Sequence, residues 1–283
     1  MRPKAKALIL DLLSVTGGLA FPVRKLAVAC ALFDISENSV RVTLVRLSAA
    51  GLIEAAGRGA YRLGESAGEF ASEVGTWRTA ETRVRTWNGD YVAVHGGSWA
   101  RSDRGAYRRG QRALQMLGFR ELTQGLSVRP DNLDGGIEFV RTRLHALGLE
   151  PEASVFRAAA FDPDLEARAR SLWDAKELVA SYRRSRARLA AWLERAPALE
   201  LDVQAREVFL LGGSAIRQVV YDPLLPAPLI DVDERRTFVD AVHRFDRSGR
   251  AIWKRFLGLN LGPAVPSTVQ LKDENPPPGG WIQ

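Results

Sequence analysis

The chain has 283 residues, of which 46% are hydrophobic and 26% charged, a composition that supports two or three folded domains and excludes global disorder. No apolar run reaches the length of a membrane span, and the N-terminus lacks the apolar core of a secretory signal. A single cysteine, Cys30, excludes an internal disulfide, so we expect a cytoplasmic protein that makes no membrane contact.

The positive charge is concentrated at the start of the chain. The net charge is +7, and residues 1–63 hold nine lysine or arginine residues against four acids, which assigns +5 to this part and +2 to the remainder. A localised basic patch is the electrostatic signature of phosphate binding. The three histidines are far apart and no Cys/His ligand spacing occurs, so we expect no metal site.

The first two predicted helices are short. Apolar spacing predicts a helix over residues 4–15, ended by Gly17 and Gly18. Pro22 is suited to the first position of a second helix, which carries Cys30 on its apolar side. We therefore expect Cys30 to be a small core residue.

A third helix and a hairpin follow. Ser36 is a good N-cap for a helix that runs to about Ala50, and Gly51 stands just past its end. Residues 52–63 then follow the pattern of strand, glycine-rich turn and strand. Residues 1–65 are thus predicted to form a winged helix-turn-helix, a unit that places its third helix in the major groove of DNA.

The third helix has two predicted faces. Val40, Leu44 and Leu47 are spaced to face the core. On the other side arginine can bond guanine, asparagine can pair with adenine, and a valine methyl can touch thymine. The alternative is that these arginines only solvate a surface helix. The predicted DNA-reading residues are Asn38, Ser39, Arg41, Val42, Val45 and Arg46, and the predicted phosphate contacts are Lys4, Lys6, Arg24, Lys25, Arg58 and Arg62.

The middle of the chain predicts a linker and a small α+β domain. Residues 66–86 are expected to hold a linker helix, with Phe70, Val74 and Trp77 on one side. Residues 87–162 then predict the order β-α-β-β-α-β, which is the ferredoxin-like arrangement. The expected strands cover residues 90–95, 119–122, 126–128 and 155–161, and the expected helices cover 103–117 and 134–147.

The last third is predicted to be helical over residues 163–258, with a proline-rich break at 222–228 and a flexible tail at 259–283. The expected helices cover residues 164–174, 176–195, 201–220 and 233–257. Arginines beside an aromatic ring could hold a nucleotide-like effector, although they also suit a solvated helix face. The candidate effector-binding residues are Arg108 and Arg109 in the middle domain and Arg183, Arg184 and Trp192 in the helical part.

These parts together resemble the PaaX-type phenylacetic acid catabolic repressors. The likeness covers residues 4–258 and rests on the segment Ser36–Leu47, on the ferredoxin-like middle, which is similar to the small CRISPR-associated Cas2 proteins, and on Asp222-Pro223-Leu224-Leu225-Pro226. The resemblance implies a homodimeric repressor of a catabolic operon that is released from double-stranded operator DNA by an aryl-CoA thioester such as phenylacetyl-CoA. The family often continues this segment with a Trp-Pro-Gly-like turn, whereas residues 227–233 read Ala-Pro-Leu-Ile-Asp-Val-Asp here, which leaves the effector open.

Two other functions compete with this hypothesis. A metal-dependent nuclease built on the ferredoxin-like domain would use Asp131 and Asp134, but the first strand of that domain ends in His95-Gly96-Gly97 without an acid. An architectural DNA binder without an effector would show a steep salt dependence and little sequence preference. We expect no catalytic residues, no cofactor beyond a possible acyl-CoA effector, and no enzyme activity.

Overall fold

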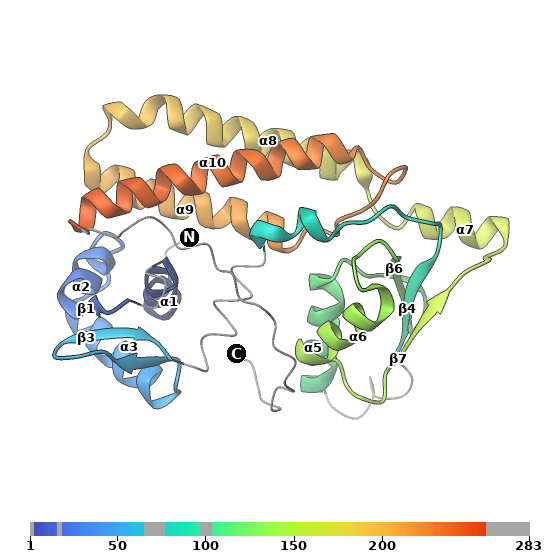
Figure 1. Ribbon diagram of the computed structural model, residues 1–283, viewed down its shortest axis with the longest axis horizontal. Coiled ribbons are helices and arrows are strands. Elements are labelled where there is room, and N and C mark those ends of the chain that lie inside the picture. Colours follow the sequence, from blue (N-terminus) through green and yellow to red (C-terminus); the bar gives the residue numbers. More distant parts are fainter. Residues whose placement is uncertain (1–2, 16–18, 65–76, 97–103, 259–283) are drawn as a thin grey trace. The chain divides into compact units, whose positions relative to one another are not determined.

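A computed structural model describes residues 3–15, 19–64, 77–96 and 104–258 (Figure 1). The chain divides into two compact units that each combine distant parts of the sequence. The winged-helix unit lies within residues 1–76, 191–214 and 243–275. The ferredoxin-like unit lies within residues 77–190, 215–242 and 276–283.

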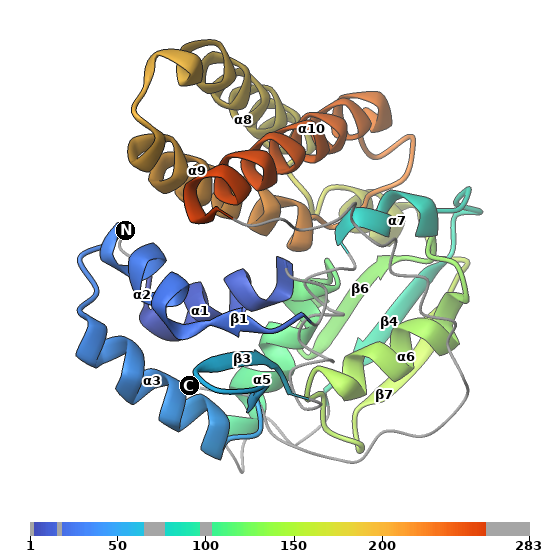
Figure 2. The same cartoon turned by 60° about the vertical axis from the view of Figure 1, so that its left-hand side comes forward.

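The winged-helix unit confirms the predicted order of helices and hairpin (Figures 1 and 2). Its three strands form an antiparallel sheet in the order β1-β3-β2. Pro22 ends the first strand directly before the second helix, and Gly17 and Gly18 lie outside the described residues. The elements are α1 Ala5–Val15, β1 Phe21–Pro22, α2 Val23–Ala31, α3 Glu37–Ala49, β2 Ile53–Ala55 and β3 Ala60–Leu63.

The core of this unit is apolar and includes residues from the far end of the chain. Cys30 is a buried free thiol, as predicted, and burial raises the pKa of this thiol to about 11. Leu257 belongs to the same core cluster, and Phe209 packs against it. The Phe209 ring lies 5.3 Å from the Phe33 ring and 6.2 Å from the Trp253 ring, measured between centroids. The winged helix therefore shares one core with two C-terminal helices.

Two short 3-10 turns stand where the sequence predicted the last part of a linker helix. They are η1 Trp77–Thr79 and η2 Glu81–Arg83, while residues 65–76 lie outside the described residues. Val84 then forms an isolated antiparallel bridge with Leu133. Val84 is extended so that it can form this bridge, and the predicted helix therefore does not reach residue 84.

The ferredoxin-like unit is built on a four-stranded antiparallel sheet in the order β5-β6-β4-β7. Helices α5 and α6 cover one face, and α7 lies against the other (Figures 1 and 2). This topology confirms the predicted ferredoxin-like arrangement. The elements are β4 Tyr91–His95, α5 Arg104–Met116, β5 Arg120–Thr123, β6 Leu126–Pro130, α6 Gly136–Ala146, β7 Ser154–Ala158 and α7 Pro163–Arg170.

Three long helices follow, at positions close to those predicted. They are α8 Ala175–Arg195, α9 Leu201–Val220 and α10 Val232–Leu257. The boundaries of the two compact units fall within all three helices. The predicted tail, residues 259–283, lies outside the described residues. Among the described helices none combines the length and the apolarity that a bilayer crossing requires.

The segment Asp222–Pro226 between α9 and α10 is held by buried polar contacts. The Tyr182 hydroxyl donates to Asp222 Oδ2 at 2.5 Å, and the Leu224 amide donates to Asp222 Oδ1 at 2.8 Å. Asn132 donates its side-chain amide to the Leu224 carbonyl at 2.7 Å. Burial raises the pKa of the Asp222 carboxyl despite these hydrogen bonds and the nearby Arg235 charge. The Asp-Pro-Leu-Leu-Pro motif is thus a loop that these hydrogen bonds hold in place inside the ferredoxin-like unit.

Candidate nucleic-acid interface

The third helix of the winged-helix unit is fixed at both ends. Ser36 is its N-cap and accepts a hydrogen bond from the Ser39 amide at 3.3 Å. At the other end Gly51 has φ 68°, a left-handed conformation that favours glycine. The Gly51 amide donates to Ser48 and the Leu52 amide donates to Leu47, both at 3.0 Å, which is a Schellman termination. These caps fix where α3 begins and ends.

The two faces of α3 separate as the sequence predicted. Val40, Leu44 and Leu47 are buried in the apolar core. On the opposite side Val45 is 67% exposed and Val42 is 41% exposed, so two apolar side chains lie among the polar residues of this surface. The outward residues of this helix are Asn38, Ser39, Arg41, Val42, Val45 and Arg46. Together they form the α3 outer face.

The two arginines of the α3 outer face differ in their contacts. Arg41 Nη2 lies 2.6 Å from Glu37 Oε1, and both side chains are largely exposed. Such an exposed pair contributes little to stability, so a base or phosphate can replace Glu37. Arg46 has no ion-pair partner among the described residues and extends from the last turn of the helix. The face thus presents one free guanidinium and one that is weakly held.

The wing carries one exposed arginine at its tip. Arg58 lies between Gly57, with φ 97°, and Gly59, with φ 71°. Both values need glycine, so the tight turn fixes Arg58 at the tip. The Gly59 carbonyl accepts from the Val23 amide at 2.9 Å, which ties the wing to the start of α2. Arg62, on the second strand, pairs with Glu54 at 2.5 Å across the hairpin.

The other candidate phosphate contacts fall into two groups. Lys4, Lys6 and Arg24 are exposed on or near α1 and α2. Lys25 instead donates its ammonium to the Gly258 carbonyl at 2.9 Å, at the end of α10. This contact fits a cation at a helix C-terminus and competes with the predicted contact to a phosphate.

The candidate effector residues are not all brought together. Arg108 and Arg109 are exposed on α5, where Arg109 lies 3.5 Å from Glu150. Trp192 is only 3% exposed and donates its indole N–H to Glu207 at 2.7 Å. The Trp192 ring is thus buried rather than open to solvent, and its effector role stays a prediction.

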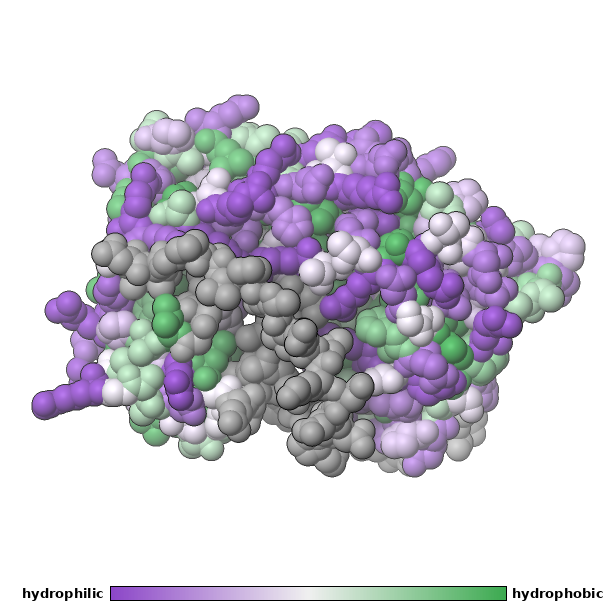
Figure 3. Space-filling model, viewed as in Figure 1, coloured by the Kyte–Doolittle hydropathy of each residue, from purple (hydrophilic) through white to green (hydrophobic). Residues whose placement is uncertain are grey.

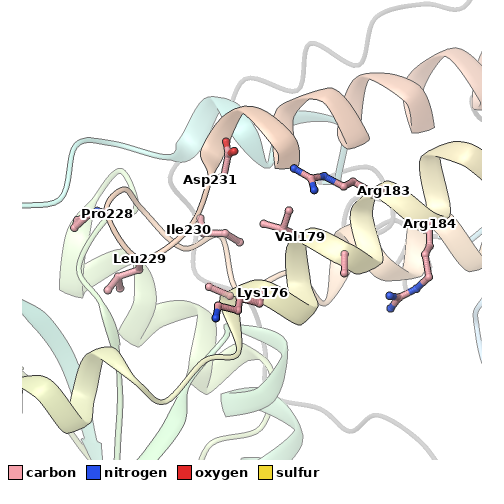
Figure 4. A pocket seen from close by; sticks show the side chains of 10 residues that line it. Lys176, Val179, Arg183, Arg184, Pro228, Leu229, Ile230 and Asp231 are labelled. Atoms are coloured by element: carbon pink, nitrogen blue, oxygen red, sulfur yellow. The ribbon is translucent and has the colours of Figure 1, made fainter.

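Arg183 and Arg184 do share a site, an open pocket of the ferredoxin-like unit (Figure 4). Its volume is about 630 Å³. Sequence analysis singled out these two arginines on α8 but not the opposite wall before α10, because the two walls are far apart in the chain. The lining residues are Ala175, Lys176, Val179, Ala180, Arg183, Arg184, Pro228, Leu229, Ile230 and Asp231.

The acids of the nuclease hypothesis do not form a metal site in the described residues. Asp131 is buried and accepts from Arg85 Nη2 at 2.7 Å, whereas Asp134 is exposed in the following turn. The described residues contain no group of three His, Cys, Asp or Glu side chains placed to hold a metal ion. Asp131 thus has a structural role, which is to anchor Arg85.

Comparison with known proteins identifies the family. The chain matches the PaaX-like protein model over residues 4–67 and the PaaX-like protein C-terminal domain model over residues 173–255. The chain belongs to the PaaX-like protein family, whose members are typically transcriptional regulators and generally not enzymes. The N-terminal match implies DNA binding.

A solved structure supports the fold alone. The uncharacterized protein Rv0674 from Mycobacterium tuberculosis aligns with a TM-score of 0.56 and 24% identity, covering 87% of this chain and 98% of that chain. No curated protein matches the sequence.

Proposed function

We propose that this protein is a repressor that binds operator DNA through the α3 outer face and leaves the operator when an acyl-CoA thioester binds. The observation that carries the proposal is the exposure of Val42, Val45, Arg46 and Asn38 on a helix whose opposite side is buried. The apolar and polar groups of this face match the edges of bases in the major groove.

The wing and the basic residues around it complete the proposed interface. Arg58 at the tip of the wing would contact a phosphate or the minor groove. Lys4, Lys6 and Arg24 would contact phosphates on either side of the recognition helix. Arg62 would also contact a phosphate once its ion pair with Glu54 is broken. The +5 charge of residues 1–63 favours the approach of this unit to DNA.

The remaining steps of the proposal come from the family. A homodimer would present two recognition helices to an inverted repeat whose half-sites lie about one helical turn, or a multiple, apart. By linkage, an effector that releases DNA must bind the DNA-incompetent form more tightly. An aryl-CoA such as phenylacetyl-CoA is the proposed effector, and a catabolic operon in the cytoplasm is the proposed target.

A titration with two DNA duplexes tests this function. The full chain is titrated by fluorescence anisotropy against the DNA upstream of its own gene and against a scrambled duplex, at one fixed salt concentration. We expect tighter binding to the upstream DNA. Arg46→Ala should weaken that binding by about 1–3 kcal/mol because a base contact is lost, and should reduce the preference over the scrambled duplex.

The matched control is Arg206→Ala, which removes an equal charge from an exposed position of α9 in the same unit. This variant should keep the preference of the wild type. Equal loss of affinity for both duplexes in Arg46→Ala would reject base reading by α3. Equal affinity of the wild type for both duplexes would instead identify an architectural DNA binder.

A further inference from the structure

The open pocket of the ferredoxin-like unit has the chemistry of a site for an anion with an apolar part. Its volume of about 630 Å³ falls in the range of about 300–1,000 Å³ typical of small-molecule sites. Val179, Leu229 and Ile230 give it an apolar floor, and Lys176 lies at its rim without an ion-pair partner among the described residues. One acid, Asp231, also lines the pocket.

Arg183 is the residue that links the pocket to α10. In Figure 4 its side chain extends from α8 toward the first turn of α10. There Nε and Nη2 donate to Glu234 Oε1 at 3.0 and 2.8 Å. Arg183 is 59% exposed, so a ligand anion from solvent can reach its guanidinium. Glu234 also lies 3.3 Å from Arg186 Nη1 and would keep a cationic partner if Arg183 turned to a ligand.

The acid on the pocket wall already has a structural task. Asp231 Oδ1 accepts from the Asp233 and Glu234 amides at 3.1 and 3.2 Å, which caps the start of α10. Its charge is therefore directed at the helix N-terminus and opposes a ligand anion less than a free carboxylate would. A ligand held by Arg183 would lie beside this first turn.

We infer that this pocket binds a ligand with an anionic group and a short apolar body, and that the anion takes the place of Glu234 on Arg183. The apolar body lies on Val179, Leu229 and Ile230. An organic acid and its coenzyme A thioester both have this chemistry, through a carboxylate or through phosphates.

The regulatory part of the inference rests on the proposed function. α10 begins with the turn that carries Glu234, and its last residues, Phe256 and Leu257, pack in the winged-helix core. Exchange of Glu234 for the ligand changes the contacts of the first turn of a helix that also completes the core beneath the DNA-reading helix. One continuous element thereby connects the pocket to the winged helix.

Calorimetric titration of the full chain with phenylacetate and with phenylacetyl-CoA, without DNA, tests the site. We expect at least one of them to bind. Arg183→Gln should weaken binding about tenfold because a charge-assisted contact is lost. Val179→Glu should also weaken binding by placing an acid on the apolar floor, while Glu234→Gln should strengthen binding about threefold by removing the competing carboxylate.

Binding of phenylacetate as tight as that of the thioester would identify the carboxylate as the recognised anion, and binding of the thioester alone would identify the phosphates.

Arg188→Gln is the matched control, since it removes an exposed charge from α8 outside the pocket and should leave binding unchanged within about twofold. Thermal unfolding checks that each variant is folded. Lack of binding by both ligands, or binding that Arg183→Gln and Val179→Glu leave unchanged, would overturn the inference. The anisotropy titration keeps the two proposals separate: specific DNA binding without ligand binding rejects only the pocket, and ligand binding without specific DNA binding rejects only the regulator.

Discussion

The two compact units are stabilised by different interiors. Among the described residues, the buried polar side chains of the winged-helix unit are limited to the neutral Gln204. The ferredoxin-like unit buries charged and polar side chains at Arg129, Asp131, Asn132, Asp222 and Arg235. An apolar core is held by packing, whereas a buried polar group is stable only while its partner is present. We therefore expect the units to respond differently to substitution and to pH.

The exposed surfaces of the two units contribute less to their difference in stability than the interiors do. Figure 3 shows that the visible surface over α8 and α10 is mostly hydrophilic. The arginines there form exposed pairs such as Arg184 with Glu177, at 2.5 Å, and such pairs contribute little. Substitutions in the two interiors should therefore reveal the difference in stability between the units.

The largest loss of stability is expected on substitution of Arg235, which is fully buried. Its Nε lies 2.6 Å from Glu81 Oε1, and Nη1 donates to the Leu225 carbonyl. Arg235→Ala leaves the mostly buried Glu81 without this partner and should lower the free energy of unfolding by about 3 kcal/mol. Denaturant unfolding measures this change in the free energy of unfolding. Arg236→Ala removes the neighbouring exposed arginine and should change stability by less than about 0.5 kcal/mol. Equal effects of both variants would contradict the difference between the interiors.

The sequence predicted what depends on local patterns. The faces of α3 and the succession of strands and helices in the ferredoxin-like unit follow from periodicity, caps and turns within short windows. The pair Arg235–Glu81 joins residues 154 positions apart, and no local pattern marks it. For the same reason the division of the long helices between the units was not predicted.

The candidate site shows the same limit. The α3 outer face was predictable because one helix carries it. Trp192 is close in sequence to Arg183 and Arg184, yet its ring is buried against Phe245 at 5.2 Å between centroids. Nearness along the chain therefore did not predict the burial of this ring. The contact of Lys25 with the Gly258 carbonyl could not be predicted either, since the two residues are 233 positions apart.

A smaller effect is expected in the winged-helix unit at Phe209, where α9 completes the core. Phe209→Ala removes ring contacts to Phe33 and Trp253 and should lower the free energy of unfolding by about 2 kcal/mol. Hydrogen exchange should rise in α1–α3 and not in the ferredoxin-like sheet. Leu210→Ala, at an exposed position of the same helix, is the control. Unchanged exchange in α1–α3 would show that the winged helix does not depend on α9.

The smallest effect is a pH dependence of the ferredoxin-like unit. The pKa of Asp222 is raised by burial, so the folded state holds its proton more tightly than the unfolded state. Its contribution to stability is therefore complete below the unfolded pKa and is lost as pH rises through the folded pKa. Relative to Asp222→Asn, the wild type should become more stable as pH falls from 7 to 4. Unfolding curves at both pH values measure this gain, and a relative loss would reject the assigned direction.

Hydrogen exchange of the full chain with and without its upstream DNA tests the central claim, that α3 reads DNA. We expect new protection in residues 37–49 and at the wing around Arg58, with the ferredoxin-like sheet unchanged at the same salt concentration. Protection confined to β4–β7, with α3 unaffected by saturating DNA, would contradict it.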